Sequence, residues 1–570
     1  MRARRLPLGM LLTLVYGSAA GEVVVAGVEG EVLANVREFL TGEPSCDAND
    51  AEVGAYAEAL PERVQPALEA FGYYEAAVTA SVDPREDDCW RIALDISPGP
   101  AVTVENVALD LLGHARDDPR FRALFDLFPL QPGSQLRHGD YRAFKARVEA
   151  LASERGYLEG RFTRERIDVF VEGSRASIEL AYDSGPRYRF GNVTFSSGVL
   201  ATRVLRSFVS FEPGDPYDAT LVVDLQRELL ESRYFADVQV TPQVDRAREN
   251  RIPVRVELEA ARPLSYSVGA GFSTDDGPRL RFLYENRRRN RAGHQLLAEA
   301  LVAQVRQYAS ADYRIPLGNP QRDWMSLKAG LAREDVDAGI GAAARFGVQR
   351  TRVRQAFTAT RFLDVLIEED DIADQDITTR LLIPGATWWT RRYRDDVVRP
   401  RRGFRLNLAV SAGLGEGTPL VETDFGGKWI TSLPWGARVL VRGRAGATFD
   451  DDDFDRVPLS MRFFAGGDHS VRGFDYESLG PRNANGELIG GNRLIEASVE
   501  YEHPLRPTWA VAVFVDAGNA FLDGDFAAER GAGIGGRWFS PIGPVRFDVA
   551  WPLGQDDGSP RLHISLGPDL

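Results

Sequence analysis

The sequence predicts three small α+β domains in series, followed by a sixteen-stranded antiparallel transmembrane β-barrel. Its length of 570 residues is too great for one hydrophobic core, since single cores stop growing near about 300 residues. A pattern of helices and strands recurs three times in the first half of the chain, and from residue 264 a period of two replaces the helical period. The composition, 44% hydrophobic and 26% charged, resembles that of a soluble protein, but a barrel with a polar lumen has a similar average.

Residues 1–20 have the pattern of a secretory signal peptide. Basic residues in Met1–Arg5 precede a short apolar run and the small residues Gly17–Ala20, after which we expect cleavage. The apolar run is too short for a membrane anchor, which needs about 20 residues. Export leads to an oxidising compartment, so Cys46 and Cys89 are expected to form one disulfide. Two buried thiols in an early domain are the alternative.

Three similar units follow this segment. Each ends in an alternating strand closed by a turn, as in Ile92–Pro100 and Ile178–Pro186. A helix precedes that strand, and one such helix has the apolar stripe Tyr141, Phe144, Val148 and Leu151, three and four positions apart. Each unit therefore reads strand, helix, helix, strand, strand, which is the content of a small α+β domain. The predicted domains are 22–98, 99–185 and 186–262.

Alternation predicts a barrel over residues 264–570. The segment 264–274 alternates between apolar residues and serines or glycines, and the same division recurs over sixteen strands of roughly the ~9–11 residues that a tilted membrane strand needs. An even number of strands closes a bacterial barrel, and tryptophans in or beside the strands suit interfacial girdles. A secreted β-sandwich also alternates and is the alternative. The acidic stretches 368–371 and 450–453 are expected in long outer loops.

Several functional classes are excluded. The net charge of −15 argues against a nucleic-acid partner, because phosphates require clustered basic residues. The sequence contains no G-x-S-x-G, H-E-x-x-H or P-loop motif, and its histidines are scattered. Asp468, His469 and Ser470 have the letters of a catalytic triad, but consecutive residues cannot normally aim at one another. We therefore expect no enzymatic activity, no cofactor and no metal site.

The longest predicted loop, about 449–491, contains a motif that identifies a family. It has Phe463–Gly467 followed by the motif residues Val471, Arg472, Gly473 and Phe474. This V-R-G-F element resembles the signature of loop six in the BamA and TamA family of outer-membrane assembly factors and two-partner-secretion transporters, whose barrels follow POTRA domains. The number of modules and the runs 381–385, 540–548 and 567–570 resemble the TamA branch most closely.

The resemblance implies that loop six folds back into the barrel and that Arg472 meets an acidic residue on the thirteenth strand. The matching run is Phe514–Gly518, in which Asp516 has the same parity as Phe514, and the resemblance implies that it points into the lumen. A guanidinium can pair bidentately with such a carboxylate. A solvated loop arginine is the alternative for Arg472.

The predicted closure of the barrel is weak. It joins the first strand, about 264–274, to the last, about 560–568, where Gly567 weakens the strand and Pro568 cannot donate a ladder hydrogen bond. A weakly paired seam agrees with the lateral gate that the resemblance implies. An opened strand edge could template incoming strands. The expected gate residues are Leu264, Gly269, Gly271, Thr274, Arg561, Ile564, Gly567 and Pro568.

The family resemblance also implies a location and partners. It implies the outer membrane of a Gram-negative bacterium, with the POTRA domains in the periplasm and outer-membrane lipids around the barrel. It implies insertion or translocation of unfolded outer-membrane proteins such as autotransporters, together with a TamB-like, inner-membrane-anchored partner that binds the POTRA arm. The alternative is a two-partner-secretion-type translocation pore, or another transport barrel, that passes its cargo through the lumen.

Overall fold

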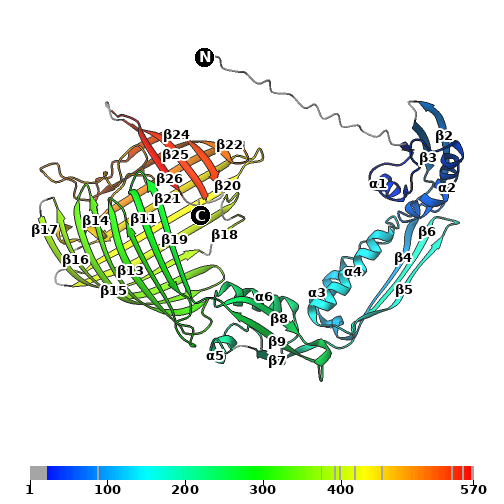
Figure 1. The fold of residues 1–570 in the computed structure, drawn as a ribbon, viewed down its shortest axis with the longest axis horizontal. Helices are drawn as coiled ribbons and strands as arrows, with labels where there is room; N and C mark the ends of the chain where they lie inside the picture. Colours follow the sequence, from blue (N-terminus) through cyan, green and yellow to red (C-terminus); the bar gives the residue numbers. More distant parts are fainter. Residues whose placement is uncertain are drawn as a thin grey trace, which may run out of the picture. The chain divides into compact units, whose positions relative to one another are not determined.

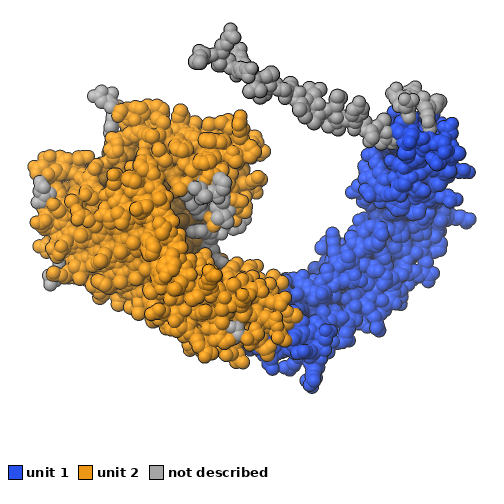
Figure 2. Space-filling view, in the orientation of Figure 1, with its two compact units in different colours: residues 1–193, 211–222, 242–254 blue, residues 194–210, 223–241, 255–570 orange. Residues whose placement is uncertain are grey.

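The computed structural model describes residues 22–566 apart from 87–88, 197, 374, 391–392, 397–398, 416–418, 451–453, 541–542 and 555–557. The predicted signal peptide therefore lies outside the described residues, as do Gly567 and Pro568 of the predicted seam. The chain divides into two compact units (Figure 2), residues 1–193, 211–222 and 242–254 and residues 194–210, 223–241 and 255–570. Among the described residues, no helix is both long and apolar enough to cross a membrane.

The first α+β domain packs two helices on a three-stranded sheet. Its elements are β1 (Glu22–Ala26), α1 (Gly30–Phe39), α2 (Asp50–Glu69), β2 (Ala77–Glu86) and β3 (Cys89–Ser97). The sheet order is β1-β3-β2, with β1 parallel and β2 antiparallel to β3. The side chain of Asn49 accepts hydrogen bonds from the first turn of α2, which starts the helix there. A disulfide between Cys46 and Cys89 joins the loop before α2 to β3.

The second and third α+β domains repeat this topology. The second contains β4 (Thr103–Leu112), η1 (Gly113–Asp117), α3 (Pro119–Asp126), α4 (His138–Arg155), β5 (Arg161–Phe170) and β6 (Arg175–Asp183), in the sheet order β4-β6-β5. The third contains β7 (Arg189–Phe195), α5 (Thr202–Arg206), α6 (Ala219–Glu231), β8 (Phe235–Pro242), η2 (Val244–Arg246) and β9 (Arg251–Ala260), in the order β7-β9-β8. Of the predicted stripe on α4, Tyr141, Phe144 and Val148 are buried, whereas Ala152 takes the buried place expected for Leu151.

The rest of the described chain forms one antiparallel sheet in sequence order, rolled into a barrel (Figure 1). Its strands are β10 (Leu264–Ser273), β11 (Gly277–Asn286), β12 (Gln295–Val302), β13 (Arg306–Pro316), β14 (Asp323–Val336), β15 (Gly339–Val353), β16 (Phe357–Ile372), β17 (Gln375–Thr390), β18 (Tyr393–Arg394), β19 (Gly403–Gly415), β20 (Leu420–Ser432), β21 (Arg438–Phe449), β22 (Arg493–Arg506), β23 (Trp509–Phe521), β24 (Glu529–Ser540), β25 (Gly543–Leu553) and β26 (Arg561–Leu566). The prediction of sixteen strands is confirmed, because β18 has only two residues and pairs with β19 beside β17.

The alternating pattern sorts side chains between two faces of this sheet. On β23, Ala510, Ala512, Phe514 and Asp516 are buried, while the intervening Val511, Val513 and Val515 are exposed. In a sandwich the apolar set would form the core, so the alternative of a secreted sandwich is wrong. The outward tryptophans Trp388, Trp389, Trp429, Trp509, Trp538 and Trp551 are also exposed. An apolar outer face around a polar interior suits contact with lipid.

A buried carboxylate connects the second α+β domain to the third. Asp118, only 4% exposed, lies 3.0 Å from Arg155 Nη2, and the same guanidinium reaches Asp218 at 3.2 Å. Burial opposes the charge of Asp118, but hydrogen bonds from Arg120 N–H and from Arg155, together with the charge of Arg187, lower the pKa of its carboxyl. The ion pair therefore requires the ionised form of Asp118.

The Asp118 contribution to stability is expected to depend on pH. Because its pKa is depressed in the folded chain, the contribution is present above the ordinary carboxyl pKa of about 3.9 and is lost as the pH falls through the folded value. An Asp118→Asn variant should lose about 1–3 kcal/mol at neutral pH. Urea unfolding of the wild-type and Asp118→Asn proteins, with hydrogen exchange of α4 as the readout, would measure both effects. An equal loss of stability in the variant at pH 3 and at pH 7 would contradict the assignment.

The disulfide is expected to stabilise the first domain alone. Because it closes a long loop, replacing Cys46 and Cys89 by serine should cost about 3–4 kcal/mol. Hydrogen exchange on the full chain should then show lost protection in α2 and β3, with β4–β6 unchanged as the internal control. Equal protection of α2 in the oxidised protein and in the double serine variant would show that the bond is not needed.

Candidate functional site

Loop six, defined here as residues 450–492 between β21 and β22, lies against the inner wall of the barrel. The motif residues Val471, Arg472, Gly473 and Phe474 are all buried, although they belong to a loop. The first part of loop six contains the short turns η3 (Phe454–Arg456) and η4 (Leu459–Met461). Burial of a loop is unusual, because its backbone groups then need partners inside the protein.

Acidic residues of β16 hold the first part of loop six. Asp370 accepts a hydrogen bond from Leu459 N at 3.0 Å, and Glu368 accepts bonds from Ser460 N at 2.8 Å and Ser460 Oγ at 2.6 Å. The expectation that 368–371 forms an outer loop is therefore wrong. The run belongs to β16, where alternate side chains face the lumen and serve as acceptors. Of the stretch 450–453, only Asp450 is among the described residues.

Arg472 forms the centre of a buried charge cluster. Its Nε and Nη2 bind the two oxygens of Asp516 at 2.7 and 3.0 Å, and its backbone N–H donates to the same carboxylate at 3.1 Å. Nη1 reaches Glu500 at 2.8 Å and Asp548 at 3.0 Å. The guanidinium carbon also lies 3.3 Å from the centre of the Phe514 ring. One loop side chain thus binds β22, β23 and β25.

Sequence reasoning identified Arg472 and Asp516 but missed the rest of this cluster. Arg537 on β24 pairs with Glu500 at 2.7 Å and also with Asp548, so the two guanidiniums share two carboxylates. We name these residues the Arg472 cluster: Arg472, Glu500, Asp516, Arg537 and Asp548. Their inward parity was visible in the sequence, but their proximity depends on the register of four strands. Strand parity alone does not give that register.

Glycines of β24 leave room for the Arg472 cluster. A Cβ on Gly531 would lie 1.8 Å from Arg472 O, and a Cβ on Gly535 would lie 1.8 Å from Asp548 Oδ1. Gly473 has φ +102°, a backbone conformation that L side chains rarely adopt. The small residues of the loop and of β24 therefore allow the backbones to approach closely enough for the charges to pair.

The seam between β10 and β26 lacks a ladder among the described residues. Elsewhere in the sheet each strand pairs with its neighbour, whereas here Thr274 N donates to Ile564 O at 3.3 Å and Ile564 N to Thr274 Oγ1 at 3.0 Å. Leu264 and Gly269 on β10 are exposed, and Gly271 is half-exposed. On β26, Arg561 pairs with Asp475 of loop six rather than with β10. Among the described residues the two seam strands are thus weakly paired, while Gly567 and Pro568, on which the sequence prediction was based, lie outside them.

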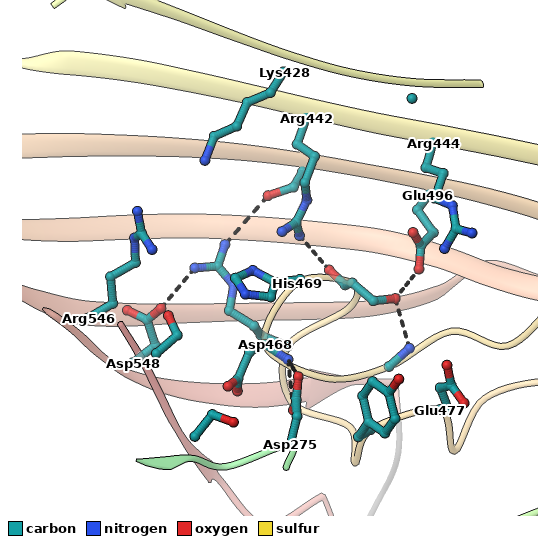
Figure 3. Close-up of a pocket in the computed structure, with 18 of the residues that line it drawn as sticks. Asp275, Lys428, Arg442, Arg444, Asp468, His469, Glu477, Glu496, Arg546 and Asp548 are labelled. Carbon is teal, nitrogen blue, oxygen red and sulfur yellow. Dashed lines mark hydrogen bonds and ion pairs between the residues drawn. The ribbon is translucent and has the colours of Figure 1, made fainter. Parts of the chain in front are cut away.

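A polar cavity of about 710 Å³ lies beside loop six in the lumen (Figure 3). Its lining includes both cations and acids, among them Lys428, Arg442, Arg546, Glu477 and Glu496. The triad letters do not form a triad, since Asp468 binds His563 and Ser470 binds Gly466 N and Glu496. A mixture of both charges in the lumen offers a wet interior without a dominant ion selectivity.

One group of side chains has the composition of a metal site. Ligand atoms of Asp275, Asp468 and His563 lie within 4.8 Å of one another, a group that contains one histidine and that sequence reasoning did not identify. However, His563 Nε2 accepts the N–H of Gly473 at 2.9 Å, which places the proton of the neutral ring on Nδ1. That proton points to Asp468 Oδ1 at 2.8 Å and occupies the position that a metal would need. The geometry therefore favours a hydrogen-bonded group.

Replacement of Arg472 is expected to release loop six. An Arg472→Ala variant leaves the fully buried Asp516 without its guanidinium, which should cost about 3–5 kcal/mol and expose the loop to protease. Arg472→Lys should restore only part of this, because lysine cannot pair bidentately. Arg482→Ala, an exposed position of the same loop, is the control and should change stability by less than about 0.5 kcal/mol. Unchanged loop protection in Arg472→Ala would disprove the anchoring role.

Comparisons with known proteins agree with this architecture. The Omp85 superfamily domain matches residues 292–569, the model for TamA POTRA domain 1 matches residues 22–98, and the surface antigen variable number repeat, a POTRA model, matches residues 188–260. The outer membrane protein assembly factor BamA of Nitratidesulfovibrio vulgaris is 23% identical over 562 residues, covering 90% of this chain and 68% of that protein. BamA of Neorickettsia risticii is 21% identical over 526 residues, covering 87% of this chain and 70% of that protein.

The fold is also found in a solved structure. The crystal structure of BamA from Haemophilus ducreyi lacking POTRA domains 1–3 aligns with a TM-score of 0.64 at 17% identity, covering 82% of this chain and 98% of that one. Three α+β domains of one topology thus precede a barrel whose sequence matches a single superfamily. The first and third α+β domains thus match POTRA models, and the barrel matches the Omp85 superfamily domain.

Proposed function

We propose that this protein is a TamA-like outer-membrane assembly factor that inserts or translocates proteins such as autotransporters through a lateral gate between β10 and β26. The observation that supports this most directly is the seam, where the described strands share no ladder. The full-length relatives are named as assembly factors of the BamA type. The TamA assignment is supported by the TamA-specific model that matches the first POTRA domain.

The proposed gate works because an unpaired strand edge is reactive. Backbone groups without partners cost several kcal/mol each in hydrocarbon, so the free edges of β10 and β26 favour pairing with another strand. An unfolded outer-membrane protein can supply that strand by β-augmentation. The Arg472 cluster braces β22 to β25, so the wall next to β26 keeps its shape while the seam opens.

The POTRA domains are the proposed binding surface for partners. Each of their sheets has two edge strands, for example β1 and β2 in the first domain. Such edges can receive strands from clients or from a TamB-like protein anchored in the inner membrane. In this proposal the POTRA domains lie in the periplasm and the apolar outer face of the barrel contacts outer-membrane lipids.

A disulfide across the seam is expected to abolish client insertion. Antiparallel extension from the bonded pair Thr274 and Ile564 brings Phe272 opposite Leu566, so the variant is Phe272→Cys with Leu566→Cys. The control is Val268→Cys with Phe282→Cys, which joins the same strand to its ladder partner on β11. Insertion of an autotransporter into proteoliposomes should stop in the oxidised seam variant and continue in the control.

The same experiment separates the gate from a pore. If the locked seam leaves insertion intact, the lateral gate is wrong. Continued secretion of a soluble cargo through the locked barrel would instead support passage through the lumen. Reduction of the locked variant should restore insertion, and reduced wild-type protein controls for the loss of the Cys46–Cys89 bond.

A further inference from the structure

Loop six contacts the first strand of the seam through Asp468. The backbone N–H of Asp468 donates to both carboxylate oxygens of Asp275, at 3.1 and 2.9 Å, and Asp275 lies in the turn that follows β10. Thr274 Oγ1 donates to Asp468 Oδ1 at 2.7 Å. Figure 3 shows the Asp275 carboxylate beside Asp468, with these bonds as dashed lines. The end of β10 is therefore bonded to loop six as well as to β11.

The same loop contacts the last strand. His563 on β26 donates from Nδ1 to Asp468 Oδ1 at 2.8 Å, and its Nε2 accepts the Gly473 N–H at 2.9 Å. Arg561, two residues earlier on β26, forms an ion pair with Asp475. Three residues of the loop thus hold β26, and they flank Arg472 in sequence.

A single oxygen atom joins the two edges. Asp468 Oδ1 accepts one hydrogen bond from Thr274 beside β10 and another from His563 on β26. One carboxyl oxygen can accept both bonds because it has two lone pairs, and Asp468 is buried, so its oxygens have little access to water. Across the seam itself, in the described residues, the strands share the two hydrogen bonds between Thr274 and Ile564. Closure thus depends on the loop at least as much as on the strands.

The loop is held firmly enough to act as a clamp. Four residues after Asp468, Arg472 is fixed to β22, β23 and β25 by the cluster described above. Gly467 has φ +105°, and a Cβ there would lie 3.0 Å from the carboxylate oxygens of Asp275, so glycine permits the close approach. Asp468 Oδ2 has no hydrogen-bond partner among the described residues, which leaves this carboxylate incompletely satisfied.

We propose that Thr274, Asp275, Asp468 and His563 form a seam latch, in which Asp468 positions both edge strands and must release them before the seam can open. The inference rests on the proposed lateral gate and names the residues that control it. The latch makes opening depend on a movement of loop six around Asp468, while the Arg472 cluster stays intact.

Hydrogen exchange of the full-length protein in lipid nanodiscs tests the latch directly. In Asp468→Ala, the amides of Thr274 and Ile564 should exchange about tenfold faster, because two hydrogen bonds are lost at the point that holds them. Amides in the ladder between β22 and β23 serve as the internal reference and should not change. The matched control is Glu487→Ala, which removes an acidic residue of the same loop that binds Asn483 away from the seam.

Milder variants keep the test decisive if Asp468→Ala does not fold. Asp468→Asn keeps the shape and removes the charge, and should show a smaller acceleration of the same amides. His563→Asn retains a side-chain N–H near the position of Nδ1, so its effect should be smaller than that of His563→Ala. Unchanged exchange at Thr274 and Ile564 in the folded variants would overturn the latch.

A bound cation and a failed gate give outcomes of their own. Acceleration of the same amides by EDTA in the wild-type protein would show that a bound cation holds the group, and would overturn a latch made of hydrogen bonds. The hydrogen-exchange measurement tests the seam latch, whereas the seam disulfide tests the proposed lateral gate. A latch that passes its test in a barrel whose locked seam still inserts clients would remain valid while the proposed function fails.

Discussion

The pairing of Arg472 with Asp516, Glu500 and Asp548 is the interaction on which the arrangement of the barrel depends. A loop that enters a polar lumen gives up contacts with water, and its buried backbone and charges must find partners. Arg472 satisfies this requirement because one guanidinium donates to three carboxylates from three strands. The carboxylates depend on it equally, since a buried acid without a counter-charge is costly. The loop and the wall therefore stabilise each other.

The barrel has one strongly bonded region, β22 to β25, and one weakly paired region, the seam between β10 and β26. Strands β22 to β25 are joined by ladder hydrogen bonds and also by the charges of Arg472 and Arg537. At β10 and β26 the described ladder is absent, and closure relies on side chains that loop six brings to the edges. A rigid wall next to a weak seam suits a barrel that opens sideways, because strain at the seam need not spread to the rest of the sheet.

The sequence predicted the parts of this structure that depend on local periodicity. Helical and alternating patterns located three α+β domains and a sixteen-stranded barrel, and parity placed Asp516 on the same side of β23 as Phe514. Contacts that depend on register across several strands were missed, such as those of Glu500, Asp548 and Arg537. The run 368–371 was misread because four consecutive acids resemble a solvated loop. In β16 only alternate members face inward, and there they accept hydrogen bonds from loop six.

Loop six stabilises the edges of β10 and β26, which share no ladder in the described residues. Open backbone edges in hydrocarbon are expensive, so a barrel with a missing ladder should be driven to pair its edges or to aggregate through them. A full ladder would remove that cost but would also need many hydrogen bonds to break together before a new strand could enter. Side-chain hydrogen bonds of Asp468 and His563 hold the two strand edges together at one end of β10. In the described residues, the rest of the β10 edge forms no ladder with β26. Breaking a few such bonds is cheaper than unzipping a ladder, since each contributes only about 0.5–3 kcal/mol net. The closed barrel is thus kept from open-edge association by contacts that an incoming strand could replace one at a time.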